Sequence, residues 1–536
     1  MTAPSRLDLA IRNARVVDGT GEEPRRCDIG VAGDRIVQLG RVDAAEQELD
    51  ARGLVVSPGF VDPHSHSDWT LHSNRDAQST IRQGVTTEIV GNCGITNAPV
   101  SGQSLDAAMG RMRAYGYSGE ITWRSFGEYL ADVEKDGVAQ NLAFLVGHST
   151  LREAAGVSGS DVDEAALATM ESLLSEAMEA GALGMSSGLE YSLGATAGTA
   201  ELMRLAAVSG RYGGMYASHV RNRDSQILES INEFLAIART GNTSAQISHL
   251  NVRDNTGAPE RGWERAVELM TNARSAGLDV QADTTPFRQG LGMMTGLLPT
   301  WVLADGPGAA ATMLRDHGVR TRLRDQCDRY WRFIHQGQWE RVRLQNSPQM
   351  PELNGLTFLE IARRRRQDVW DSYFDVLAAA GEGIGNLIMV GDLFTEKHLA
   401  EMVSHPLFSL GVDAYTSVDH GPLSQITANP LPYRGHVEYL THHVRETKTL
   451  TLAEAIRKMA GQPAARFGLS GRGLIRPGYY ADIVVFDSDG LHSNSTFANP
   501  AVYPDGIKLV TVNGQVVVRD AEHTGRRAGR VLRRRS

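Results

Sequence analysis

The stretch Val56-Ser57-Pro58-Gly59-Phe60-Val61-Asp62-Pro63-His64-Ser65-His66 combines a broken apolar run with two closely spaced histidines. Pro58-Gly59 interrupts the run, which resumes at Phe60-Val61. Alternate residues of a β-strand face the same side, so His64 and His66 are expected to point together from the end of one strand. Two imidazoles placed in this way can bind a divalent metal ion. Because short His-x-His pairs also occur on ordinary strand faces, the assignment depends on other parts of the chain.

The length and composition indicate a large globular protein with more than one structural unit. The chain has 536 residues, which is enough for a barrel of about 250 residues and a second module. Its 41% hydrophobic and 22% charged residues are typical of globular proteins. The net charge of −9 argues against nucleic-acid binding, because no overall basic field is present. We interpret the basic run from Arg526 to Arg535 as a solvated terminus.

Cysteine usage and the absence of a long apolar run bear on location. Cys27, Cys93 and Cys327 are odd in number and widely separated, which argues against a disulfide framework and for a reducing compartment. The segment from Met1 to Ala10 has no apolar core of signal-peptide length, and no uninterrupted membrane-spanning run occurs elsewhere. We therefore expect a cytoplasmic protein with no membrane partner, and the oligomeric state stays open.

The two ends of the chain share one sequence pattern. Residues 7–56 consist of short alternating apolar segments separated by Gly and Asp turn residues, and the same pattern returns at 478–487 and 507–518. This pattern is typical of antiparallel strands. We expect both ends to form one small β-sandwich, with residues 1–57 and 471–536 as its two parts and residues 58–470 inserted between them.

The middle of the chain alternates short apolar strands with longer helical patterns. Expected strands are Thr86 to Gly91, Asn141 to Val146, Leu183 to Ser186, Met215 to His219, Ala245 to His249, Val280 to Asp283, Ile388 to Val390 and Leu410 to Asp413. Expected helices include Asp163 to Ala180, Thr199 to Tyr212, Gln226 to Thr240 and Arg261 to Ala276. This alternation predicts an α/β fold, a (β/α)₈ TIM-like barrel. The rhythm fails between Thr284 and about Asp371, so this segment is an expected insertion that covers the site, with Leu297, Leu298 and Trp301 on its apolar underside.

Metal-binding residue types recur where the expected strands end. Besides His64 and His66, these positions carry Cys93, His219, His249 and Asp413. Each has an ordinary structural explanation, since a lone cysteine or histidine is often a core residue and an aspartate often caps a loop. In a barrel, however, the carboxyl ends of the strands meet at one face, where active sites lie. Their recurrence at five strand ends favours a metal centre.

Several motifs resemble those of the N-acyl-D-amino-acid deacylases, or D-aminoacylases, of the amidohydrolase superfamily. They are the 58–66 stretch, Gln83-Gly84-Val85-Thr86-Thr87, Gly91-Asn92-Cys93-Gly94, Gly188-Leu189-Glu190-Tyr191, Leu298-Pro299-Thr300-Trp301 and Ala481-Asp482-Ile483-Val484-Val485-Phe486-Asp487. The likeness extends over nearly the whole chain. Its most specific element is Gly-Asn-Cys-Gly.

The resemblance implies a zinc site in which Cys93 replaces the carboxylated lysine found elsewhere in the superfamily. It implies that Cys93, His219 and His249 hold one tightly bound Zn²⁺, and that His64 and His66, with Cys93 bridging, hold a weaker second metal in some members. Asp413 matches the catalytic aspartate, which carries a proton from the attacking water to the leaving nitrogen. A thiolate suits zinc, and a carboxylate suits a proton shuttle.

The sequence departs from this family where the substrate carboxylate is bound. The family has a lysine after the second histidine of the tight site and a later His-Pro-Arg, whereas this chain has Asn251 and Leu431. Arg253 and Arg434 are candidate substitutes, although neither aligns cleanly. Tyr191 matches a tyrosine near the substrate, and its neighbour Glu190 is a further substrate-binding candidate. For Tyr191, packing at the barrel mouth is the structural alternative.

The sequence therefore predicts a zinc-dependent amidohydrolase that acts on a small molecule, most simply an N-acyl-D-amino acid or a related N-acyl compound. One alternative is an amidohydrolase acting on a cyclic amide, a carbamoyl compound or a specialised metabolite without a free carboxylate. A second alternative is a non-catalytic metal-binding scaffold on the same fold. The presence of Asp413 argues against the scaffold, which needs no proton shuttle.

Overall fold

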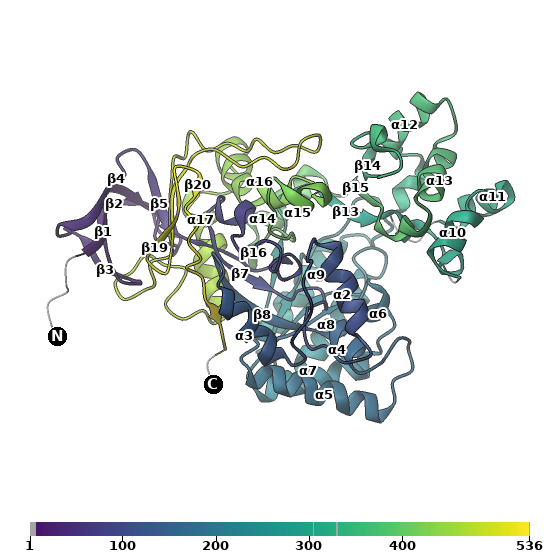
Figure 1. The fold of residues 1–536 in the computed structure, drawn as a ribbon, viewed down its shortest axis with the longest axis horizontal. Helices are drawn as coiled ribbons and strands as arrows, with labels where there is room; N and C mark the ends of the chain where they lie inside the picture. Colours follow the sequence, from purple (N-terminus) through teal and green to yellow (C-terminus); the bar gives the residue numbers. More distant parts are fainter. Residues whose placement is uncertain (1–6, 304, 328–330, 428, 535–536) are drawn as a thin grey trace.

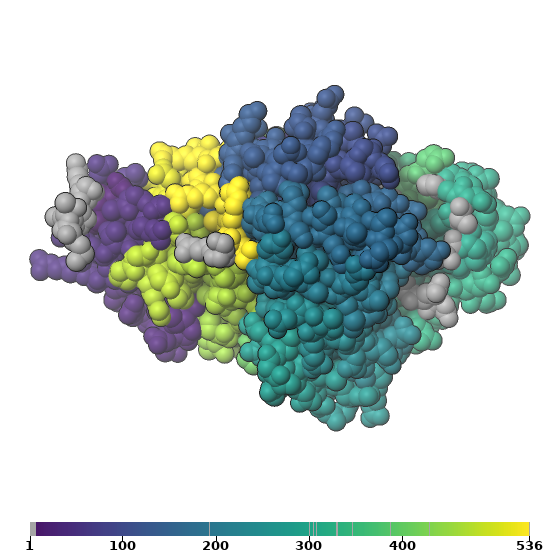
Figure 2. Space-filling model, turned by 90° about the horizontal axis from the view of Figure 1, so that it is seen from below, coloured from purple at the N-terminus to yellow at the C-terminus, as the bar shows by residue number. Residues whose placement is uncertain are grey.

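The computed structural model describes residues 7–534 except 304, 328–330 and 428. Three parts follow one another along the longest axis (Figure 1): a β-domain built from both chain ends, a central barrel, and a lobe at the far end. The space-filling view shows the same order, with the purple and yellow chain ends on the left and the green lobe on the right (Figure 2).

The two chain ends share one nine-stranded sheet, which confirms the predicted pairing of the termini. Its strands are β1 Leu7–Val16, β2 Arg25–Ala32, β3 Arg35–Gly40, β4 Ala45–Asp50, β5 Val55–Pro58, β17 Ile483–Phe486, β18 Ile507–Val512, β19 Gln515–Arg519 and β20 Glu522–His523. The join is antiparallel pairing of β17 with β5, in which Ile483 lies opposite Pro58. Alternating apolar residues such as Ile11, Ile29 and Val485 form a buried cluster beside it.

The central part contains the eight parallel strands of the predicted barrel, hydrogen-bonded in sequence order. They are β6 Phe60–Asp62, β7 Val85–Val90, β8 Asn141–Gly147, β9 Gly184–Gly188, β10 Met215–His219, β11 Ser244–Ile247, β12 Val280–Thr284 and β16 Phe408–Leu410. A parallel bridge between Ser65 and Ala414 joins the segments that follow the first and last strands. This closure brings Asp413 beside His64, whose carbonyl accepts the Asp413 N–H at 3.0 Å.

Gly59 marks the passage from the β-domain to the barrel. β5 ends at Pro58 and β6 begins at Phe60, so the chain changes sheets at this glycine. A Cβ atom built on Gly59 would lie 2.1 Å from the hydroxyl oxygen of Thr86, which leaves no room for a side chain. The Pro58-Gly59 break therefore separates two sheets within one apolar run.

Amphipathic helices cover the barrel. Those expected from the sequence form as α5 Glu164–Glu179, α7 Thr199–Arg211, α8 Ile227–Gly241 and α9 Gly262–Ser275. Asp163 caps α5 by accepting the N–H of Ala166. Residues three or four apart on α8, such as Ile227, Ile231 and Phe234, are buried against the barrel strands. None of the described helices is both long enough and apolar enough to cross a membrane.

The expected barrel strand from Ile388 to Val390 is wrong. These residues belong to β15 Ile388–Asp392, the middle strand of a separate antiparallel sheet with β13 Gln289–Met293 and β14 Val342–Asn346. The excursion from the barrel sheet therefore continues past Asp371 as far as β15. Leu297 and Leu298 are buried in a hydrophobic cluster that includes lobe residues such as Phe374.

The lobe also contains helices, which Figure 1 shows at the end of the molecule opposite the β-domain. They are α10 Pro307–Met313, α11 His317–Gln326, α12 Phe358–Arg365 and α13 Val369–Ala380. Thr357 and Glu360 form a capping box at the start of α12.

Candidate metal centre

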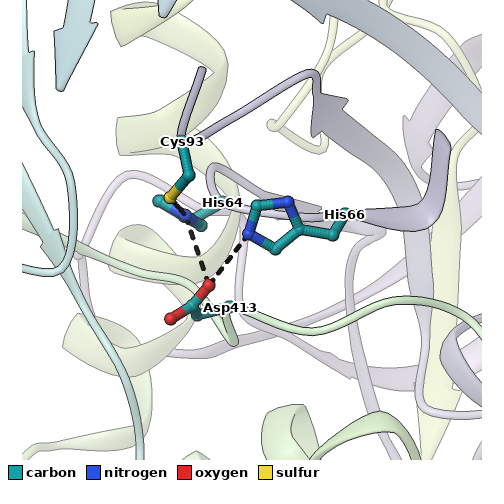
Figure 3. Close-up of side chains that lie close together, drawn as sticks. All are labelled: His64, His66, Cys93 and Asp413. Carbon is teal, nitrogen blue, oxygen red and sulfur yellow. Dashed lines mark hydrogen bonds and ion pairs between the residues drawn. The ribbon is translucent and has the colours of Figure 1, made fainter. Parts of the chain in front are cut away.

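Cys93 lies at the centre of two overlapping groups of potential metal ligands. One group contains Cys93, His219 and His249, and the other contains His64, His66, Cys93 and Asp413. In each group the candidate ligand atoms lie within 4.8 Å of one another. The second group is drawn in Figure 3, where the thiol and both imidazoles surround the Asp413 carboxylate.

The distances around the thiol fit a zinc ion. The Cys93 sulfur lies 3.3 Å from His64 Nε2, 3.5 Å from His249 Nε2 and 3.9 Å from His219 Nδ1. Zn–S and Zn–N bonds of about 2.3 and 2.0–2.1 Å at a tetrahedral angle place sulfur and nitrogen about 3.5 Å apart. A thiolate with imidazoles is also a donor set that zinc prefers. The residues present therefore fit the ion chemically and in their spacing.

Each candidate ligand stands at or just after the carboxyl end of a barrel strand. His219 ends β10, whereas Cys93, His249 and Asp413 lie two or three residues beyond β7, β11 and β16. Those last three have left-handed backbones, with φ of 53°, 36° and 56°. Non-glycine residues in this region cost about 1–3 kcal/mol each and concentrate at functional sites. A Cβ on Gly188 would approach the Cys93 carbonyl to 2.2 Å, so the absence of a side chain there lets the Cys93 loop pack closely.

Asp413 faces three histidines at once. Its carboxylate oxygens lie 3.1 Å from His66 Nε2, 3.4 Å from His64 Nε2 and 3.9 Å from His249 Nε2. Burial alone would raise the pKa of Asp413, but the neighbouring histidines hold it well below its ordinary value. The carboxylate is therefore ionised at neutral pH and able to accept a proton.

The pKa values of His249 and His66 are shifted in opposite directions. Burial lowers the pKa of His249 to about 4, and the charge of Arg223 adds to this effect. For His66, burial is outweighed by Asp413 and Cys93, which raise its pKa to about 9. Burial opposes ionisation of Cys93, yet His64 and hydrogen bonds from His219 and His249 lower its pKa well below the usual thiol value. A neutral imidazole and a thiolate are the forms that bind metal.

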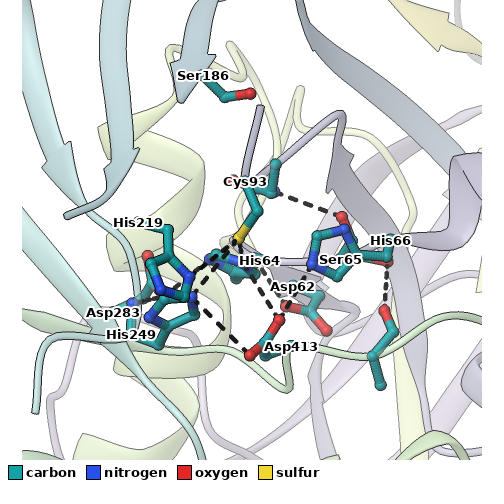
Figure 4. A network of polar contacts seen from close by, with 12 residues as sticks. Asp62, His64, Ser65, His66, Cys93, Ser186, His219, His249, Asp283 and Asp413 are labelled. Atoms are coloured by element: carbon teal, nitrogen blue, oxygen red, sulfur yellow. Dashed lines mark hydrogen bonds and ion pairs between the residues drawn. The ribbon is translucent and has the colours of Figure 1, made fainter. Parts of the chain in front are cut away.

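Asp283 is a site residue that our sequence analysis did not identify. Figure 4 shows it behind the histidines. One carboxylate oxygen lies 3.1 Å from His64 Nδ1 and accepts the His249 backbone N–H at 2.8 Å. The other accepts a hydrogen bond from Gln246 at 2.8 Å. Asp283 thus connects the two histidine pairs. Its position at the end of the expected strand Val280 to Asp283 was the sequence feature that could have identified it.

Tyr191, Glu190 and Arg253 also lie at this face of the barrel. The Tyr191 hydroxyl is 3.0 Å from His219 Nδ1, although the residue is 43% exposed. Glu190 Oε2 is 2.7 Å from His219 Nε2 and accepts a hydrogen bond from Arg253 at 2.8 Å. Burial would raise the pKa of Glu190, but the charges of Arg253 and Arg223 hold it well below its ordinary value.

Arg434 has a different environment. It lies on α16 Leu431–Glu438, where its guanidinium donates two hydrogen bonds of 2.7 Å to Glu438. The ring of Phe287 lies 5.3 Å from the guanidinium carbon. Among the described residues, no contact between Arg434 and the metal-ligand groups is recorded.

Comparison with known proteins identifies the family. The model of the amidohydrolase family matches residues 47–343 and 385–518. The chain belongs to the amidohydrolase family. This amidohydrolase is 32% identical over 532 residues to the D-aminoacylase of Alcaligenes xylosoxydans xylosoxydans, covering 98% of each chain. It is 31% identical to the N-acyl-D-glutamate deacylase of the same organism, covering 99% of this chain and 97% of the relative.

Solved structures agree with this membership. A D-aminoacylase structure, described with a binuclear metal centre, superposes with a TM-score of 0.80 at 29% identity and covers 98% of this chain and 100% of its own. An N-acyl-D-glutamate deacylase from Bordetella bronchiseptica, complexed with zinc and a phosphonate inhibitor, gives 0.78 at 27% identity and covers 99% and 100%. The chain is a metal-dependent amidohydrolase with a TIM-like barrel, an enzyme that hydrolyses amide bonds.

Proposed function

We propose that this amidohydrolase uses zinc to remove the acyl group from N-acyl-D-amino acids or closely related N-acyl compounds. The observation that carries this proposal is the buried Cys93, His219 and His249 set at zinc spacing, with the ionised Asp413 beside it. The names of its relatives, which are 31–32% identical over nearly the whole chain, support the substrate class.

In this proposal Cys93, His219 and His249 would hold the tightly bound zinc, and His64 and His66, together with Cys93, would form a weaker second site. Zinc bound there would supply Lewis acidity, which lowers the pKa of a water molecule and polarises the scissile carbonyl. Asp413 accepts the proton of the attacking water and then donates it to the leaving nitrogen. Asp413 contacts both histidine pairs, so its carboxylate is placed to act at the shared centre.

Tyr191 is our candidate for a substrate contact. Its hydroxyl lies 3.0 Å from the metal-facing nitrogen of His219 while its ring is partly exposed, so one residue contacts both the ligand shell and the open side of the site. Although the residue is partly exposed, desolvation of its hydroxyl beside His219, together with the charges of Cys93 and Asp413, raises the pKa of Tyr191 well above its ordinary value. The hydroxyl therefore keeps its proton and can donate a hydrogen bond to a substrate oxygen.

A second candidate substrate class has its own supporting observation. Arg253 is held by Asp224 at 2.9 Å and by Glu190 at 2.8 Å, and Arg434 is held by Glu438. Both arginines that the sequence offered as grips for a substrate carboxylate are thus already paired with protein carboxylates. This pairing favours a substrate without a free carboxylate, such as a cyclic amide or a carbamoyl compound.

One experiment separates the two classes. The zinc-loaded enzyme is assayed on matched N-acyl-D-amino acids, N-acyl-L-amino acids and the corresponding carboxylate-free amides. Preference for the D-acids supports the first class, and activity on carboxylate-free amides alone supports the second. Absence of amide hydrolysis in all three, with zinc bound, would contradict the proposed chemistry.

We also infer that the enzyme works in a reducing compartment such as the cytoplasm. Its three cysteines are odd in number and widely separated in the sequence, and Cys93 serves the proposed centre as a thiolate. Cell fractionation with an antibody against the enzyme tests the location.

A further inference from the structure

A small network of buried charges lies behind the tight pair of histidines. Glu190 follows β9, Arg223 and Asp224 follow β10, and Arg253 follows β11, so consecutive strand ends supply its members. Both arginines and His219 converge on one atom, Glu190 Oε2, which lies 2.7 Å from His219 Nε2, 2.8 Å from Arg253 and 3.1 Å from Arg223.

The two ring nitrogens of His219 face opposite sides, one toward the candidate metal site and one toward this network. Its Nδ1 atom faces the Cys93 sulfur at 3.9 Å, and its Nε2 atom faces away, 2.7 Å from Glu190 Oε2 and 3.1 Å from Arg223 Nη2, with the carboxylate as the nearer partner. An imidazole that binds metal through Nδ1 keeps its proton on Nε2. That N–H then donates to the Glu190 carboxylate, which fixes both the tautomer and the rotation of the ring.

The remaining members hold Glu190 in place. Arg253 spans from Glu190 to Asp224, and Asp224 accepts a further hydrogen bond of 2.7 Å from the Thr256 hydroxyl. Arg223 spans from Glu190 to His249, lying 2.9 Å from its Nδ1. Two carboxylates and two guanidinium groups balance in charge, which a buried ionic cluster requires.

We propose that Glu190 is a positioning residue that orients His219 toward the metal, and that Arg253 with Asp224 fixes Glu190 in that role. This inference rests on the proposed zinc site and concerns residues that the sequence had offered as substrate contacts. It predicts that loss of Glu190 changes metal affinity and ligand geometry more than it changes substrate binding.

The test compares Glu190→Gln with Glu438→Gln as a matched control. Both variants remove a carboxylate that is hydrogen-bonded to arginine, but Glu438 pairs with Arg434 on α16. We expect Glu190→Gln to weaken zinc binding about 10–100-fold in chelator competition, the usual effect of losing a partner of a ligand histidine. The visible spectrum of the cobalt-substituted enzyme should change as well. Glu438→Gln should leave both readouts at wild-type values.

Arg253→Met provides a second variant that keeps the Glu190 carboxylate. It should weaken zinc binding in the same direction but less, and it carries the test if Glu190→Gln does not fold. Unchanged zinc affinity and cobalt spectrum in the folded variants, with a raised KM, would overturn the inference and assign Glu190 to the substrate. Failure of the wild-type enzyme to bind zinc would instead contradict the proposed function itself.

Discussion

The two histidine pairs that meet at Cys93 differ in what lies behind them. The outward nitrogen of His219 faces Glu190, and that of His249 faces Arg223. On the other side, neither His64 Nδ1 nor His66 Nδ1 makes a hydrogen bond to the described residues, but His64 Nδ1 lies 3.1 Å from an Asp283 carboxylate oxygen. His66 instead stacks on Trp69, with ring centroids 4.3 Å apart.

Under the proposed assignment, the clearest contrast is between His219, which has a carboxylate behind it, and His66, which has none in the described part of the chain. Hydrogen-bonded partners fix the tautomer and orientation of a ligand imidazole, and they raise metal affinity. His219 has such an acceptor in Glu190, whereas Arg223 beside His249 Nδ1 is a donor and offers no acceptor for an N–H there. His66 contacts Trp69, Asp413 and Cys93, and its pKa of about 9 means that protons compete with metal for it at neutral pH.

The largest effect is expected from His219→Ala. Removing this ligand leaves Cys93 and His249 on the tight side, too few protein ligands for a stable zinc site. Tightly bound zinc should be lost, and activity at limiting zinc should fall at least about 10³-fold, because metal stabilises transition-state charge by several kcal/mol. Metal analysis after dialysis and kcat/KM are the measurements. Retention of one zinc per chain would show that His219 does not hold the tight metal.

Asp413→Asn should separate chemistry from metal binding. Asparagine has nearly the same shape but cannot accept a proton, so kcat should fall at least about 10²-fold while the tight zinc remains. Steady-state kinetics on metal-analysed protein gives the answer. Activity within a few-fold of wild type would place the proton shuttle elsewhere.

His66→Ala should affect only the weaker side. The tight zinc should stay at one per chain, whereas binding of a second equivalent should be lost, because His64 and Cys93 alone remain there. Zinc titrations of the wild-type enzyme and the His66→Ala variant, monitored by calorimetry, measure the two sites separately. Loss of the first equivalent would mean that His66 belongs to the tight site, which contradicts the proposed assignment of the two pairs.

The smallest effect is expected from Arg434→Met. Arg434 is partly exposed but its partner Glu438 is buried, so removing the arginine should cost about 1–3 kcal/mol of unfolding free energy. Zinc content should not change, and kcat/KM should stay within about twofold, as is usual for substitutions away from a site. A large rise in KM for carboxylate substrates, absent for neutral amides, would show that Arg434 binds the substrate carboxylate.

Much of the fold was predictable because the barrel strands have a recognisable local sequence pattern. Short apolar segments that end in histidine or aspartate recur, and a barrel gathers such ends on one face. The same rule failed at Ile388 to Val390, because a short buried strand has the same apolar pattern in a lobe as in a barrel. What distinguishes the two is long-range pairing, which a local pattern does not contain.

The residues behind the ligands were harder to predict. Arg223 lies four residues beyond His219, in a loop without periodicity, so only the fold places it beside His249. Arg253 and Glu190 were noticed as charges near the site, but the sequence could not show that they face each other. Charge balance within a buried network depends on side-chain directions, and these become visible only in three dimensions.

The central claim is that Cys93 holds the tightly bound zinc, and zinc content after dialysis tests it most directly. The matched pair is Cys93→Ala and Cys327→Ala, since both thiols are buried, at 2% and 0% exposure. Without its thiolate the tight site retains only two neutral donors, so Cys93→Ala should lose its zinc while Cys327→Ala keeps one equivalent. Full zinc occupancy in Cys93→Ala would contradict the account and make Cys93 a packing residue.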